Sequence, residues 1–220
     1  MSAVWNVLSS LRRVSWAPVA LDLRDEFTGA GAFGGIRLSL DRQSGPDWIE
    51  TDIEPTRNAG GMFLYTGIGR AMDPAAAPSF RVRVRIEADY YRPAFQATDD
   101  AIEFEVPTYN DSVAPAFFPI LPEVVLMLPS AAYPFGGHVR RIHGRVLDLA
   151  GRPLADAIVE ADAVERVITG PAGDFTLPLR WQAPNANVNV VVQHPRSGGT
   201  AGRIFTLPGD LTGNHDITVT

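Results

Sequence analysis

Apolar and polar side chains alternate along several short stretches of this chain, a period of two that predicts β-strands with one buried face. In FRVRVRIEA, three aliphatic residues alternate with Arg81, Arg83 and Arg85, and in AIEFEVP three apolar residues alternate with Glu103 and Glu105. If these strands are antiparallel neighbours, arginines and glutamates face each other on the solvent side, and each pair contributes about 0.2–1 kcal/mol. Three arginines in a row also suit an anion site, but the glutamates are a sufficient partner.

Further strands are expected throughout the chain, because 20 Gly and 18 Pro are spread along it and separate short segments rich in Val, Ile, Phe and Thr. Helical spacing is confined to Val4, Val7, Leu8 and Leu11. The fold class predicted is therefore all-β. The other expected strands are VALDL, IRLSL, GMFLYTGI, RRIHGRVLDL, AIVEADAV, ERVITG, DFTLPL, NVNVVVQH, GRIFTLP and HDITVT.

The stretch from residue 107 to 137 is rich in proline and in large apolar residues, and EVVLML within it reads as a strand. Proline at this density blocks helices and interior strands. A solvated linker would be more polar, so we expect a tight strap between two β-sandwich domains of the prealbumin or immunoglobulin type. The predicted organisation is an N-terminal arm (1–17), a β-sandwich (18–107), the Pro-rich strap (108–137) and a second sandwich (138–220).

The last 80 residues carry a spaced motif, Gly-x-Val, then Asp-x-x-Gly-x-Pro-Leu-x-x-Ala-x-Val, then Thr-Gly-x-x-Gly-x-Phe-x-Leu. This order resembles the carboxypeptidase regulatory-like domain, a small prealbumin-type β-sandwich. The resemblance implies that Phe175 is buried between two sheets. The first half of the chain echoes parts of this pattern and is interpreted as either a divergent sandwich of the same kind or an unrelated one. The matching residues are Gly144, Val146, Asp148, Gly151, Pro153, Leu154, Ala157, Val159, Thr169, Gly170, Gly173, Phe175 and Leu177.

The resemblance predicts a fold and no chemistry. Intradiol dioxygenases have a similar motif, but their iron is held by tyrosines and histidines that follow it, and no tyrosine follows Tyr133 here. Hydroxyisourate hydrolases end in Tyr-Arg-Gly-Ser, which NHDITVT does not reproduce. No His-x-x-Glu pair of a zinc peptidase and no Gly-x-Ser-x-Gly nucleophile context occurs either. We therefore expect a protein that is not an enzyme and that has no cofactor.

The charge and composition of the chain argue against several classes of partner and binding site. The net charge of −6 and the isoelectric point near 5.2 argue against nucleic acid as a partner. Cysteine is absent, so thiolate metal sites are excluded, and His138 and His143 are five apart in an extended segment, which sends them to opposite faces. No apolar window suits a membrane span. Arg12 and Arg13 follow the first apolar stretch, so no signal peptide is predicted and synthesis in the cytoplasm is expected.

Three functions remain open. The first is a structural or protein-interaction module that binds other protein chains of a larger assembly, with self-association as one form. By analogy with small β-sandwich adaptors and decoration proteins, the most specific form of this hypothesis is a component of a bacterial phage-tail-like or contractile injection particle. The second is a carbohydrate- or ligand-binding accessory module using Trp48 or Trp181, and the third is an enzyme with a concealed site. The candidate anchors for protein binding are Trp5, Trp16, Phe117, Phe118 and Tyr133.

Overall fold

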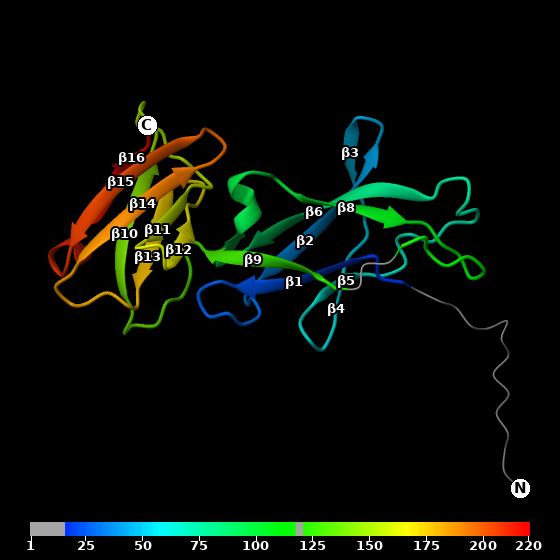
Figure 1. Cartoon of the computed structure of the whole chain (residues 1–220), viewed down its shortest axis with the longest axis horizontal. Coiled ribbons are helices and arrows are strands. Elements are labelled where there is room, and N and C mark those ends of the chain that lie inside the picture. The colour runs from blue at the N-terminus through cyan, green and yellow to red at the C-terminus, as the bar shows by residue number, and fades with distance from the viewer. Residues whose placement is uncertain (1–15, 118–120) are drawn as a thin grey trace, which may run out of the picture. The chain divides into compact units, whose positions relative to one another are not determined.

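The computed structural model describes residues 16–117 and 121–220, and its elements are almost all strands (Figure 1). Strands hold 49% of the residues and helices 3%, so the predicted all-β class is confirmed. Two short 3-10 helices are described, η2 (Ala94–Ala97) and η3 (Gly209–Leu211). The strands of the first half are β1 (Val19–Asp25), β2 (Ile36–Ser44), β3 (Asp47–Glu50), β4 (Thr56–Arg57), β5 (Phe63–Tyr65), β6 (Ser79–Ala88), β7 (Tyr91–Pro93) and β8 (Ile102–Pro107).

The remaining strands follow the expected segments closely, because each has the alternation that buries one face of a sheet. They are β9 (Glu123–Pro129), β10 (Arg140–Leu147), β11 (Ile158–Ala161), β12 (Glu165–Ile168), β13 (Asp174–Leu179), β14 (Asn187–His194), β15 (Gly199–Thr206) and β16 (Asn214–Thr218). Four sheets result, with the orders β4-β5-β1-β9-β7, β3-β2-β6-β8, β13-β10-β16 and β12-β11-β14-β15.

The alternating strand β6 lies beside β8, as predicted from the facing rows of charge. Its aliphatic residues Val82, Val84 and Ile86 are all buried. On the other face, Arg81 forms an ion pair with Glu103, whereas Arg83 binds the buried carboxylate of Asp41 at 2.7 Å. Arg81 and Arg83 therefore have carboxylate partners, which removes the argument for an anion site there.

The Pro-rich strap contains a sheet strand. The predicted strand in EVVLML is confirmed as β9, which lies between β1 and β7 in the five-stranded sheet. By compactness the chain divides into two units. The first comprises the residues up to Leu21, Leu40–Arg83 and Glu103–Glu123, and the second comprises Asp22–Ser39, Val84–Ile102 and Val124–Thr220. The four-part organisation expected from the sequence stays a prediction.

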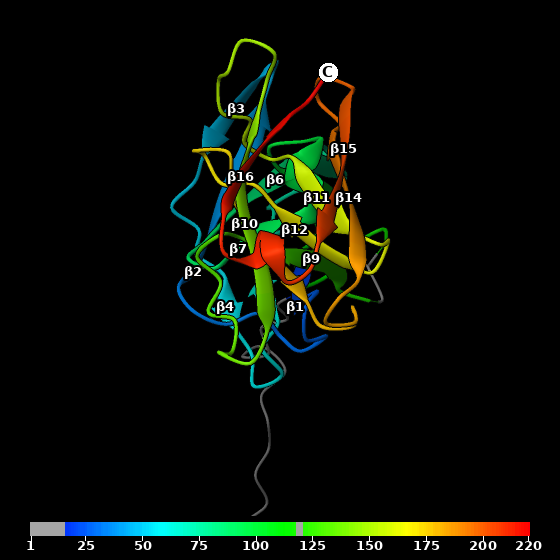
Figure 2. The ribbon, with the colours of Figure 1, turned by 90° about the vertical axis from the view of Figure 1, so that its left-hand side faces the viewer.

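Within the second unit, β10 and β16 lie on one side and β14 and β15 on the other (Figure 2). In the antiparallel register of β10 and β13, Gly144 stands opposite Phe175, which is 2% exposed, as predicted. A Cβ atom at position 144 would lie 2.2 Å from the carbonyl oxygen of His215 and 2.6 Å from the Phe175 ring. Glycine is required at position 144 because the neighbouring strand and the ring fill that space.

Candidate functional site

The second unit contains a cleft of about 520 Å³. Its walls come from the end of β6, from β7 and η2, from the loop after β9 and from the turn before β13, and every residue of the lining belongs to this unit. Such a volume lies within the ordinary range of ligand sites in proteins. The lining residues are Ile86, Glu87, Ala88, Asp89, Tyr91, Arg92, Gln96, Ser130, Ala131, Ala132, Gly170, Pro171 and Asp174.

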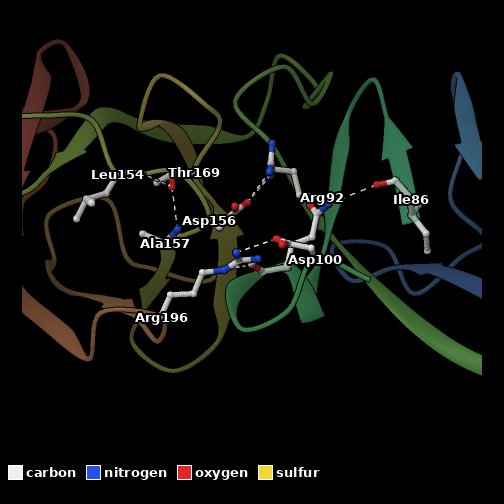
Figure 3. A network of polar contacts seen from close by, with 9 residues as sticks. Ile86, Arg92, Asp100, Leu154, Asp156, Ala157, Thr169 and Arg196 are labelled. Carbon is white, nitrogen blue, oxygen red and sulfur yellow. Dashed lines mark hydrogen bonds and ion pairs between the residues drawn. The ribbon is translucent and has the colours of Figure 1, made fainter. Parts of the chain in front are cut away.

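Two arginine ion pairs hold the elements around the cleft (Figure 3). Arg92, on β7, binds the carboxylate of Asp156 through Nε at 2.7 Å and Nη2 at 2.6 Å. Arg196 binds Asp100 at 2.8 Å and also donates to the backbone oxygen of Gln96 through Nε and Nη2, at 3.1 and 2.8 Å. The short helix η2 is thus held through its backbone beside the cleft.

The turn that forms the opposite wall is organised by a buried threonine. Thr169 Oγ1 donates to the carbonyl oxygen of Leu154 at 2.7 Å and accepts the N–H of Ala157 at 2.9 Å (Figure 3). The next residue, Gly170, lies against Asp174: a Cβ atom on this glycine would come within 2.6 Å of Asp174 Oδ1. Glycine at position 170 therefore makes room for the Asp174 carboxylate at the wall of the cleft.

The side-chain amide of Gln96 has a hydrogen-bond partner for its nitrogen and none for its oxygen among the described residues. Its amide nitrogen donates to the backbone oxygen of Ile86 at 3.4 Å, whereas its amide oxygen is buried and has no hydrogen-bond partner among the described residues. The reverse orientation of the amide would set two oxygens against each other, so the carbonyl of Ile86 decides which atom remains unpaired. A buried acceptor without a partner is costly, and such groups call for an explanation.

Aromatic rings pack beside the cleft around a buried carboxylate. Asp25 accepts the hydroxyl of Tyr133 at 2.7 Å, the hydroxyl of Thr28 at 2.7 Å and the N–H of Phe27 at 2.9 Å. Tyr133 also packs against the rings of Phe27, Phe33, Tyr91 and Phe135. Burial, followed by the bond to Asp25, raises the pKa of Tyr133 well above its usual value. The Tyr133 hydroxyl therefore stays protonated at neutral pH and donates to Asp25.

A second feature is the exposed apolar stretch, by which we mean Val113, Phe117, Leu121, Val124 and Leu126. Water reaches a large share of these side chains, although large apolar residues are usually turned inward. The exposed fractions are 49% for Val113, 46% for Phe117, 78% for Leu121, 54% for Val124 and 41% for Leu126.

The structure separates the five candidate anchors. Trp5 and Phe118 lie outside the described residues. Phe117 is exposed, as an anchor requires. Trp16 is half-buried in the first unit. Its backbone N–H donates to the Tyr109 hydroxyl at 3.1 Å, and its backbone carbonyl accepts the N–H of Gly67 at 2.8 Å. Tyr133 is 6% exposed and already packed in the aromatic cluster, so intramolecular packing accounts for this ring.

The residues of the cleft carry no signal in the sequence. Gln96 and Asp174 come from distant parts of the chain and stand out in no pattern, and Gly170 appears only as a member of the C-terminal motif. Within residues 16–117 and 121–220, no group of three or more His, Cys, Asp or Glu side chains is placed to hold a metal ion. In the same ranges, no helix is long and apolar enough to cross a membrane.

Comparisons with known proteins add no assignment. No protein-family model matches the chain, and no curated protein matches it significantly. The likeness to the carboxypeptidase regulatory-like domain therefore remains a prediction based on the motif between Gly144 and Leu177.

Proposed function

We propose that this protein is a non-catalytic structural or interaction module that binds other protein chains. The observation that supports it best is the exposed apolar stretch. Exposed apolar side chains become interface anchors when a partner removes them from water. At about 25 cal/mol per Å² of apolar surface, burial of such side chains supplies part of an association free energy.

The finer form of the proposal is a component of a phage-tail-like or contractile injection particle. A small all-β module with an exposed apolar stretch suits an adaptor or a decoration, because it buries that stretch only in the assembly. The C-terminal residues 138–220 are proposed to be a domain of the carboxypeptidase regulatory-like type. In support, Gly144 and Phe175 of the motif occupy positions where close packing allows little else.

The test is affinity purification of the tagged full chain from its native source, with partner chains identified by mass spectrometry after cross-linking. The variant Phe117→Ser/Leu121→Ser should lose those partners and keep the wild-type melting temperature, because both side chains are exposed. Leu149→Ser is the control, since Leu149 lies between β10 and β11 and is as exposed as Leu121. Unchanged recovery of the same chains with the double variant would contradict the proposal.

A second candidate, saccharide binding, is favoured by one observation. Trp181 is 72% exposed, whereas Trp48 is half-buried with the guanidinium of Arg83 5.0 Å from its ring centre. An exposed indole is a suitable platform for a sugar ring. Titration with oligosaccharides should then quench Trp181 fluorescence in the wild type and have no effect in Trp181→Ala. An identical response from both proteins would eliminate this candidate.

A further inference from the structure

We propose that the outer edge of β15 binds an extended segment of a partner protein, as an added antiparallel strand with an acidic residue opposite Arg203. This inference rests on the proposed function and adds the way in which one segment of the partner is recognised. Three features of the second unit support it: a long edge strand with open backbone groups, an exposed isoleucine beside them, and an arginine that no described carboxylate neutralises.

The strand β15 has eight residues and lies at the end of its sheet, so that β14 is its only strand neighbour there. Edge strands are usually short or interrupted by proline, because open backbone groups attract other chains. The other three edge strands of the sheets built from β10 to β16 follow that rule: β12 has four residues, β16 has five and β13 contains Pro178. The edge of β15 is protected in neither way.

The two ends of the β15 edge are closed within the chain. Thr200 faces away from β14, because its N–H donates to the carbonyl oxygen of Thr220 at 3.1 Å and its own carbonyl accepts the N–H of Thr220 at 3.3 Å. Alternate residues of an edge strand face the same way. Thr206 belongs to this set, and its N–H donates to Oδ2 of Asp210 at 2.6 Å. A strand can therefore be added only between these two ends.

Between the closed ends, Gly202 and Ile204 direct their backbone N–H and C=O groups outward by the same alternation. Both residues are exposed, and no described residue binds these four groups. An added segment of about five residues satisfies them through ladder hydrogen bonds. The Ile204 side chain is 66% exposed, so an apolar partner residue opposite it gains a cross-strand contact.

Arg203 lies between these two residues and carries a charge that is open to a partner. Its guanidinium lies 4.9 Å from the centre of the buried Phe205 ring, donates to the backbone oxygen of Asp216 at 3.3 Å and lies 3.3 Å from Nδ1 of His215. The Asp216 carboxylate itself is bound to Arg145 at 3.2 Å. Among the described residues, no carboxylate forms an ion pair with Arg203. The guanidinium is thus held in place by groups that leave its charge without a counterion.

The position of Arg203 selects the chemistry of the partner. An added antiparallel strand places one residue directly opposite Arg203, where aspartate or glutamate forms a favourable pair and a like charge is destabilising. A second copy of this chain suits the edge poorly. The antiparallel register that pairs Gly202 of one copy with Ile204 of the other would place the two Arg203 side chains opposite each other. The occupant is therefore a different chain, with an acidic residue between two apolar ones.

The experiment uses the full chain, labelled with nitrogen-15, and capped pentapeptides. The parent peptide is Thr-Val-Glu-Val-Thr. One control replaces its glutamate by lysine, and another carries N-methyl groups on both valines, which removes two N–H donors and keeps the side chains. We expect the parent peptide to shift the N–H signals of Gly202 and Ile204 in a saturable way and to slow their hydrogen exchange. The lysine peptide should bind roughly tenfold more weakly, and the methylated peptide should not bind.

Matched variants locate the binding edge. Gly202→Pro removes the outward N–H and leaves the pairing with β14 in place, so it should abolish peptide binding with little change in melting temperature. Gly202→Ala keeps the N–H, and its Cβ atom meets no atom within 4 Å, so it should bind like the wild type. Arg203→Glu should reverse the preference, so that the lysine peptide binds more tightly than the parent peptide.

Several results would overturn the inference. They are the absence of saturable shifts with the parent peptide, equal binding of the parent and methylated peptides, and equal peptide affinities of Gly202→Pro and Gly202→Ala. An unchanged order of the glutamate and lysine peptides with Arg203→Glu would refute the acidic residue opposite Arg203. If the signals of Gly202 and Ile204 shift on dilution without peptide, the occupant is a second copy and the assigned partner is wrong.

The two proposals fail separately. If partner chains depend on Phe117 and Leu121 while the peptides do not bind, the assignment of the β15 edge alone is refuted. If the parent peptide binds at this edge and no partner chain is recovered from the native source, the proposed function is refuted and the edge remains a peptide site.

Discussion

Replacement of Phe175 by alanine tests the packing on which the C-terminal strands depend. The ring is 2% exposed and fills the space above Gly144, where a Cβ atom would approach it to 2.6 Å. No neighbouring side chain can move into the vacated volume from position 144, since glycine has none. The backbone oxygen of His215 on β16 closes the same space from the other side. We therefore expect a cavity that collapses poorly.

The expected cost is about 3–5 kcal/mol, the range for truncation of a buried phenylalanine, and poor collapse places it in the upper part of that range. For a chain of this size, each kcal/mol lowers the melting temperature by roughly 2–4 °C, so the midpoint should fall by roughly 6–20 °C. Urea unfolding followed by circular dichroism gives the free energy directly.

Phe175→Leu is the matched control, because leucine keeps most of the apolar volume and should cost clearly less than alanine. A melting temperature of Phe175→Ala within about 2 °C of the wild type would refute the reasoning. It would mean that the Phe175 ring does not pack between β10 and its neighbours, and that the register of β10 and β13 is wrong. Equal losses for the leucine and alanine variants would point to a lost aromatic contact instead of a cavity.

Three further outcomes are expected. Arg180→Met should destabilise the fold by about 3 kcal/mol in urea unfolding, since it leaves the buried Glu165 carboxylate without its bidentate partner at 2.6 and 3.0 Å; a loss below about 1 kcal/mol would contradict this. Hydrogen bonds, above all from the backbone N–H of Arg152, lower the pKa of Asp148 in the folded state. The stabilisation of the fold by this carboxylate is therefore present above the pKa of the group in the unfolded chain and is lost as the pH falls through its pKa in the folded state. Asp148→Asn should thus be less stable than the wild type at pH 7, with a difference that shrinks below about pH 4; a constant difference across that range would count against it. EDTA should leave the melting temperature unchanged in a thermal shift assay, and a reproducible drop of several degrees would reveal a bound metal.

The alternation of apolar and polar residues was enough to predict most of the longer strands. It located β6 and β8 and the side of each strand that is buried, because side chains alternate between faces for geometric reasons that involve no distant residue. The resemblance of the C-terminal motif to a known domain predicted the burial of Phe175, which is 2% exposed. It missed β3, β4 and β7, which are short, and β7 ends in Pro93, a residue that argues against a strand.

Tertiary structure alone decided how distant segments meet. The sequence predicted a strand in the strap, and only the structure shows that this strand, β9, lies between β1 and β7. The choice of neighbour depends on hydrogen bonding to β1, which is about a hundred residues away along the chain. Tyr133 was a candidate anchor for a partner chain, and the carboxylate of Asp25, 108 positions earlier, gives its hydroxyl a buried partner within the chain.

The cleft shows the same division. The sequence contains Gln96 and Asp174 as ordinary polar residues, and their types are all that it determines. After folding, the surrounding backbone and side-chain groups leave Gln96 with a buried amide oxygen that has no hydrogen-bond partner among the described residues. They leave Asp174 at the wall of the cleft. Hydrogen-bond satisfaction is a property of the whole packed arrangement, so a local pattern of residues cannot encode it.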